Sequence, residues 1–335
     1  MAYETDTEER RVDRLVDEPD GTAERIKRGL GFRDEQKNLT GLLFCLPNIV
    51  LFSVFLLGPV LFAFYISFSE YSMMTQQSTW IGLDNFREIL FPLPWSNGFE
   101  PLRDPLANTW WWSLRTTFIY AIGVVPLQIF GGLAVALMLD RRVRMKKAYR
   151  AAYFMPVMLS GAASAVIWRW LVADNGIVNE LLAPIGLAHN WAGDPSTALG
   201  VIMLMAIWGG IGFNMILFLA GLQNIPNELY EASRIDGASG WQRFRHVTWP
   251  NLQNTNFFVI VMAIIGAFQV FGIALVFEQG GPHYATTTAV LLIYERAFEQ
   301  NVFGEGAAMA MVLFLIIFAF SYYQYQYQKS EEVDY

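Results

Sequence analysis

The stretch ELYEASRIDGASGWQRFRHVTWP, residues 228–250, is a polar segment that separates two long apolar runs. It carries three acidic and three basic residues, with small side chains gathered around an Asp-Gly pair. The flanking runs, residues 195–227 and 251–277, contain no Asp, Glu, Lys or Arg. Both exceed the ~20 residues that a helix needs to cross about 30 Å of hydrocarbon. The polar segment is therefore expected to join two membrane-spanning helices.

The rest of the chain repeats this pattern of charge-free runs. Of its 335 residues, 54% are hydrophobic and only 16% are charged, whereas soluble domains carry about 25% charged residues. A charge at the centre of a membrane helix costs about 2.5–3.5 kcal/mol, so the runs favour spanning helices over buried helices of a soluble protein. We expect an all-α polytopic membrane protein with six transmembrane helices, near residues 42–68, 114–139, 151–172, 198–222, 254–277 and 307–327.

The two ends of the chain differ from this transmembrane domain, which we place at residues 41–328. Residues 1–40 hold 11 acidic and 8 basic residues, without the apolar core of a cleaved secretory signal. This composition predicts a solvated, flexible tail, to which no activity is assigned. Residues 329–335 are expected to form a second, short tail.

The distribution of basic residues predicts the orientation in the membrane. If the N-terminus is cytoplasmic, the inside segments hold 18 Lys and Arg residues and the outside segments hold five. Short loops rich in Lys and Arg stay in the cytoplasm, and the loop at residues 140–150, DRRVRMKKAYR, is a clear example. Both termini are therefore expected inside, which places residues 228–250 on the cytoplasmic face.

The local signals in residues 228–250 predict two short helices joined by a turn. Gly237 can adopt a positive φ and end the first helix near Ile235. Ser239, followed three residues later by Gln242, fits a capping box that opens the second helix. The small residues would let another backbone approach closely, while large aromatic ones could anchor the segment. From these residues alone, a docking site for a partner and an amphipathic loop lying on lipid remain equal alternatives.

The same segment resembles the EAA loop of ABC importer permeases. The family pattern is E-A-A, three residues, G, nine residues and I-x-L-P. Here Glu231-Ala232-Ser233 is followed by Gly237 and then by VTWP at residues 247–250, with Ser, Val and Trp as mild departures. The flanking text LAGLQNIPNELYEASRIDGAS, with GLDNFREIL and EQGGPHYATTTAVLLIYERAF elsewhere, is similar to the sugar-importer branch and to its maltose and glycerol-phosphate type first permease subunit. The resemblance covers roughly residues 41–327.

This resemblance implies a transport subunit and not an enzyme, in the cytoplasmic membrane of a prokaryote. Its expected partners are a second homologous permease, two copies of an ABC ATPase and an extracytoplasmic solute-binding protein that delivers a sugar or sugar derivative; no nucleic acid is expected. The coupling loop would dock the ATPase, which would bind ATP and Mg²⁺, because this chain contains no G-x-x-x-x-G-K-[ST] sequence and needs no cofactor of its own. The expected docking residues are Glu231, Ala232, Ser233, Asp236, Gly237, Ala238, Phe244 and Pro250.

Polar side chains within the apolar runs indicate where a substrate could pass. Asn214 is expected midway along the fourth helix and Gln269 midway along the fifth, and both amides could bind sugar hydroxyls. The resemblance implies that the equivalent parts of these two helices line the sugar site. The expected pathway residues are therefore Gly210, Phe213, Asn214, Phe268, Gln269 and Phe271. The alternative is that both amides only join helices. The segment at residues 277–286 could contact the binding protein or merely connect helices five and six.

Two other classes of protein fit the sequence less well. A secondary transporter or channel, the main alternative, would need charged residues within the membrane or a repeated pair of broken helices. An intramembrane enzyme would need a nucleophile with a base or a metal site. The lone cysteine, Cys45, and the scattered histidines lack metal-ligand spacing, so no metal is expected.

Overall fold

The computed structural model describes residues 34–72, 77–141 and 144–332. Most of the tail predicted over residues 1–40, and the end of the tail predicted over residues 329–335, lie outside the described residues. Among the described residues, the regular structure is helical except for one short hairpin, in which β1 (Ser69–Ser72) pairs antiparallel with β2 (Gln77–Trp80). The chain divides into two compact units, Met1–Phe62 and Ala63–Tyr335, and each is described by itself.

The described part of the first unit, from Asp34 onward, is helical. It contains α3 (Asp34–Phe52), η1 (Ser53–Leu57) and the first residues of α4 (Gly58–Ser67), which continues into the second unit. The apolar stretch Leu43–Ser67 is long enough to cross a membrane. Its large side chains stay exposed, with Phe44 at 83% and Phe55 at 74%. Such a surface suits contact with lipid or with another membrane helix.

The second unit is built around four long helices. These are α7 (Thr109–Asp140), α11 (Ala198–Gln223), α15 (Gln253–Phe268) and α18 (Phe303–Glu332). In the described part of the chain, five helices are long and apolar enough to span a membrane, or six if one bent pair counts as a single span. The expected helical membrane fold with about six spans agrees with this range.

The bent pair occupies the place of the third predicted helix, and the prediction of one continuous helix over residues 151–172 was wrong. The chain forms α8 (Lys146–Phe154) and η3 (Met155–Met158), then α9 (Gly161–Leu171) at 98° to them. Pro156 lacks an amide donor and interrupts the helical hydrogen bonding. The Ser160 hydroxyl then accepts from the amide of Ala163, at 3.2 Å, and caps a new helix.

The fifth predicted helix, over residues 254–277, is also interrupted. It forms α15 and α16 (Gly272–Glu278), and residues 269–271 between them leave the helical conformation, with Phe271 at φ −138° and ψ −70°. This segment contains no proline. The interruption is held by a tertiary contact, because the buried Thr288 hydroxyl donates to the carbonyl oxygen of Val270 at 2.9 Å.

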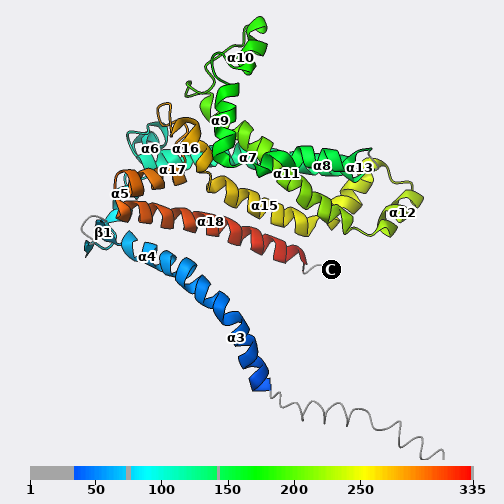
Figure 1. Ribbon diagram of the computed structural model, residues 1–335, viewed down its shortest axis with the longest axis horizontal. Coiled ribbons are helices and arrows are strands. Elements are labelled where there is room, and N and C mark those ends of the chain that lie inside the picture. The colour runs from blue at the N-terminus through cyan, green and yellow to red at the C-terminus, as the bar shows by residue number, and fades with distance from the viewer. Residues whose placement is uncertain (1–33, 73–76, 142–143, 333–335) are drawn as a thin grey trace, which may run out of the picture. The chain divides into compact units, whose positions relative to one another are not determined.

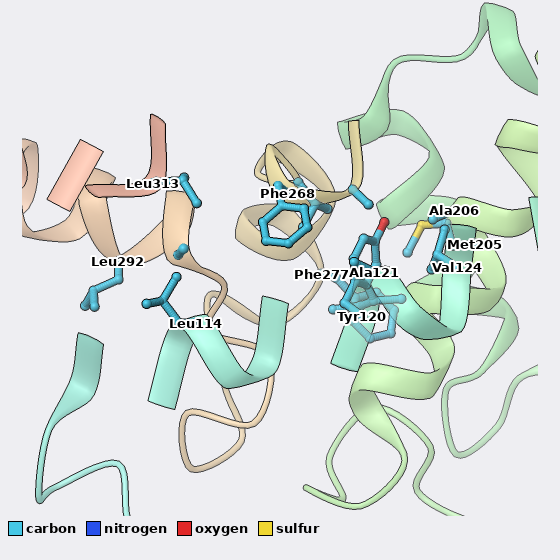
Figure 2. Packing of buried hydrophobic residues seen from close by; sticks show 14 of the residues in the cluster. Leu114, Tyr120, Ala121, Val124, Met205, Ala206, Phe268, Phe277, Leu292 and Leu313 are labelled. Carbon is cyan, nitrogen blue, oxygen red and sulfur yellow. The ribbon is translucent and has the colours of Figure 1, made fainter. Parts of the chain in front are cut away.

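The core of the second unit lies between α7, α11, α15 and α18. Figure 2 shows Val124 of α7 close to Met205 and Ala206 of α11, all of them buried. Phe268 packs in the same cluster, with its ring 5.0 Å from that of Phe118 and 5.7 Å from that of Phe320. Where these side chains leave water, burial contributes about 25 cal/mol per Å² of apolar surface. Where lipid surrounds the helices, close packing of side chains stabilises the bundle instead.

Short helices occupy the two ends of these long helices. In Figure 1, α12 (Asn227–Ile235) and α13 (Gly240–Arg243) lie at one end, where the yellow ribbon turns. The opposite end holds α6 (Glu100–Arg103), α16 and α17 (Ala289–Tyr294). The remaining short elements are α5 (Asp84–Leu90), η2 (Ser96–Gly98), α10 (Ile177–Leu182), η4 (Ala183–Ile185), η5 (Phe244–Thr248), α14 (Trp249–Asn251) and η6 (Glu295–Glu299).

The segment between α9 and α11 is held together by the buried amide of Asn179. Its nitrogen donates to the carbonyl oxygens of Ala173 and His189 at 3.1 and 2.9 Å. Its oxygen accepts from the amide of His189 and from the indole nitrogen of Trp191, at 3.0 and 2.9 Å. A single satisfied amide thus fixes a loop that exposes Leu181 of α10.

Candidate functional site

The polar loop at residues 228–250 forms the two short helices that its sequence predicts. Gly237 lies after α12 with φ +75°, and the amide of Ala238 donates to the carbonyl oxygen of Ser233 at 2.9 Å. Ser239 and Gln242 form the capping box at the start of α13, through bonds of 3.3 and 2.7 Å. The loop geometry therefore follows from local signals alone.

Most of the surface of α12, the first helix of this loop, is exposed. None of the α12 residues is buried, and Ile235 is 87% exposed at its end. Of the predicted docking residues, Glu231, Ala232, Asp236, Gly237 and Pro250 are exposed and Ser233 and Ala238 are half-buried. Exposed apolar side chains beside charged ones are typical of a surface that another protein covers.

Two aromatic side chains attach the loop to the bundle. The hydroxyl groups of Tyr230 and Thr248 share a hydrogen bond of 3.1 Å, which joins α12 to the chain leading into α15. Tyr230 and Phe244 also pack against a buried cluster from α7, α11 and α15. Phe244, predicted as a docking residue, is therefore half-buried and anchors the loop from the inside.

A cavity of about 560 Å³ lies beside the middle of α7 and α11. Its wall is completed by η3, by α9 and by the interrupted helix that runs from α15 to α16. Volumes of 300–1,000 Å³ are typical of small-molecule sites. The two helix breaks described above both contribute to this wall, through residues 156–162 and 270–273.

The structure brings four of the six predicted pathway residues to the cavity. Gly210, Phe213, Asn214 and Phe271 line it, whereas Phe268 and Gln269 do not. Phe268 turns into the core, as described above. Gln269 is exposed at the helix break instead of lying within a continuous helix.

Three polar residues of the wall are absent from the sequence-based set. Gln128 and Tyr120 of α7 and Ser164 of α9 line the cavity together with Asn214. Gln128 could have been found, because it is the lone amide within the charge-free run at residues 116–139. The described residues that line the cavity include no Asp, Glu, Lys, Arg or His. The wall is therefore mostly apolar, with a few polar side chains and none that is charged.

The amide nitrogen of Asn214 has no hydrogen-bond partner in the described part of the chain. This nitrogen is buried and, among the described residues, no acceptor lies within hydrogen-bonding distance. Leaving a buried donor unpaired costs about 1–3 kcal/mol. A group of this kind in a cavity wall can be satisfied by a ligand that accepts a hydrogen bond.

Comparison with known proteins identifies the kind of molecule that carries these features. Residues 128–329, more than half of the chain, match the model for "Binding-protein-dependent transport system inner membrane component". The chain belongs to this permease family. The alternative of a secondary transporter or channel is disfavoured, and the permease is a membrane-spanning transport component, not an enzyme.

The permease is similar to curated relatives over most of its length. It is 34% identical to the probable ABC transporter permease protein YesP of Bacillus subtilis, over 86% of this chain and 89% of the relative. It is 31% identical to the trehalose/maltose transport system permease protein MalF of Thermococcus litoralis, over 80% of this chain and 86% of the relative. A chain of a bacterial alginate ABC transporter, solved with an alginate-bound periplasmic protein, shares the fold with a TM-score of 0.70 at 20% identity, over 87% of this chain and 94% of that chain.

Proposed function

We propose that the permease forms one part of the translocation pathway of an ABC importer for a neutral sugar or sugar derivative. Relatives from the same family support this class of substrate, since one is named for trehalose and maltose transport. The proposed location is the cytoplasmic membrane of a prokaryotic cell, which the family description favours.

The observation that carries the proposal is the wall of the cavity, which combines a few uncharged polar side chains with apolar and aromatic ones. Sugars present many hydroxyl groups, which both donate and accept hydrogen bonds, and apolar ring faces that pack on aromatic side chains. Asn214 lies in this wall, and its buried amide nitrogen is unpaired among the described residues. Phe213 and Phe271 contribute rings to the same wall. The absence of charge among the described lining residues favours a neutral ligand over an ionic one.

The exposed loop around α12 is proposed as the coupling loop, which docks a separate ATPase on the cytoplasmic face. The exposed surface of α12 would bind the ATPase. The hydrogen bond between Tyr230 and Thr248 would transmit a movement of α12 to the chain that leads into α15. The proposed orientation has both termini inside. The bias of Lys and Arg toward the inside segments supports it.

The proposed assembly contains the remaining components of an importer. A second homologous permease would complete the pathway, two ATPase subunits would bind ATP and Mg²⁺, and a solute-binding protein would deliver the sugar from outside. The alginate transporter solved with its periplasmic protein supports such an arrangement by its shared fold.

Uptake measurements test the proposed function directly. Cells that carry the permease gene and cells that lack it are given radiolabelled neutral mono- and oligosaccharides, including trehalose and maltose. The proposal predicts uptake of at least one of them only in the presence of the gene, and its loss when cellular ATP is depleted while the membrane potential is maintained. Uptake that follows the ion gradient instead of ATP would contradict it.

A further inference from the structure

The contact between α7 and α11 contains two amide side chains, each seated on a glycine of the other helix. Gln128 of α7 lies against Gly210 of α11, where a Cβ atom would clash with the amide of Gln128. One turn further along, Asn214 of α11 lies against Gly132 of α7, where a Cβ atom would come within 2.5 Å of that of Asn214. The two helices thus place both amides on one wall of the cavity.

The orientation of the Gln128 amide is fixed by a hydrogen bond to α11. Its Nε2 atom donates to the carbonyl oxygen of Ala206 at 2.8 Å. A carbonyl oxygen can only accept, so the nitrogen end of the amide must face Ala206 and the oxygen end must face away. Among the described residues, none donates a hydrogen bond to Oε1 of Gln128.

Oε1 of Gln128 is therefore an unpaired acceptor in a side chain that lines the cavity. Asn214, whose buried Nδ2 is also unpaired, lies one turn further along the same helix contact. A hydroxyl group of a ligand can donate to Oε1 of Gln128, whereas an apolar group cannot. We propose that Gln128 contacts the substrate and sets specificity by accepting a hydrogen bond from one sugar hydroxyl. This inference rests on the proposed function and adds a residue from α7 to its site.

The test asks whether Gln128 recognises one hydroxyl or only supports the helix contact. The assembled transporter carries Gln128→Met, which keeps the length of the side chain on Gly210 and removes both hydrogen-bonding ends. Leu127→Met, next to it on α7 but 57% exposed, is the matched control. Initial uptake rates are measured for a neutral sugar that the unaltered transporter imports and for its series of monodeoxy derivatives, each lacking one hydroxyl.

The proposal predicts that one monodeoxy derivative is imported about three- to tenfold less efficiently than the parent sugar by the unaltered transporter, as expected for one lost hydrogen bond. In Gln128→Met this penalty disappears for that derivative and persists for the others. The control variant keeps all penalties. A uniform slowing of every sugar in Gln128→Met would show that the residue acts only in packing, and would overturn the proposal.

A second variant tests the assigned acceptor if Gln128→Met fails to reach the membrane. Gln128→Glu retains an acceptor oxygen, so the same derivative should keep its penalty although overall uptake falls. Loss of the penalty in Gln128→Glu, with normal amounts of protein in the membrane, would contradict the assigned acceptor. An unaltered transporter that imports no neutral sugar would instead contradict the proposed function, independently of Gln128.

Discussion

At the scale of single residues, the side chain that most affects the proposed transport is Asn214. It occupies the middle of α11, is 4% exposed and has no acceptor for its amide nitrogen among the described residues. A protein that needed only a packed helix could place an apolar residue here without the cost of an unpaired donor. We therefore propose that a ligand, and not the fold, accounts for this residue.

Replacing Asn214 separates these two explanations. We expect Asn214→Ala to reduce sugar uptake by about three- to tenfold, the value of one hydrogen bond, while the amount of protein in the membrane stays unchanged. Gln269→Ala is the comparison, because this amide is exposed and does not line the cavity. It should change uptake by less than about twofold. Equal losses in the two variants would contradict the position of the site.

Gly237 is the residue on which the shape of the coupling loop depends. Its φ of +75° is strained for residues with a branched side chain, while Asn adopts it more readily. A Cβ atom at this position meets nothing within 4 Å, so crowding inside the chain plays no part. Any effect of substitution must come from the backbone or from a partner.

Two substitutions at Gly237 are expected to differ. The strain of ~1–2 kcal/mol in Gly237→Val should lower the binding-protein-stimulated ATPase rate of the assembled transporter by about fivefold or more, whereas Gly237→Asn should retain most of it. The measurement is phosphate release in proteoliposomes. Full stimulation with Val at this position would argue against a docking role for the turn.

At the scale of elements, two of the predicted spans are broken helices whose breaks shape the cavity. The sequence contained a local signal for one of them, in Pro156 and Ser160. The other break, at residues 269–271, depends on Thr288, which directly precedes α17 and lies 18 residues after Val270 in the chain. A pattern of apolar residues does not reveal such a contact. The long runs, the coupling-loop turn and the capping box could be predicted because they rest on composition and on neighbours in sequence.

The break after α15 is held by the buried hydroxyl group of Thr288, and the residue after Thr288 is bonded to α7. Thr288 donates to the carbonyl oxygen of Val270, and the next amide, that of Ala289, donates to Oγ1 of Thr117 on α7 at 2.9 Å. Thr117 and Thr288 are both fully buried. The first bond satisfies a carbonyl group at the break, and the second joins the start of α17 to α7.

Removing the hydroxyl of Thr288 tests this role. Thr288→Val keeps the shape of the side chain but leaves the Val270 carbonyl unpaired, at a cost of about 1–3 kcal/mol. The apparent Tm in detergent should fall by about 2–10 °C, with a parallel loss of uptake. Thr288→Ser retains the donor and should behave much like the unaltered protein. A Tm for Thr288→Val equal to that of the Ser variant would show that the bond does not hold the break.

At the scale of the whole molecule, we assign the coupling loop and the cavity of the second unit to different tasks. The loop lies at one end of the long helices (Figure 1), and the cavity is lined by residues from the middle of α7 and α11. The chain lacks a phosphate-binding G-x-x-x-x-G-K-[ST] sequence. In the proposed assembly another subunit supplies the energy for transport, and the exposed surface of α12 is the proposed point of contact.

Site-directed crosslinking from α12 tests this central claim most directly. In a Cys45→Ser background, which removes the single native cysteine, Ile235→Cys places a thiol at the exposed end of α12, and Leu181→Cys places one on α10 as the matched control. Membranes are treated with a bifunctional thiol reagent, and the adducts are identified by mass spectrometry. The account predicts that Ile235→Cys is joined to an ABC ATPase subunit and that Leu181→Cys is not. An Ile235→Cys thiol that reacts only with reagents added from outside the cell, and never with an ATPase subunit, would contradict it.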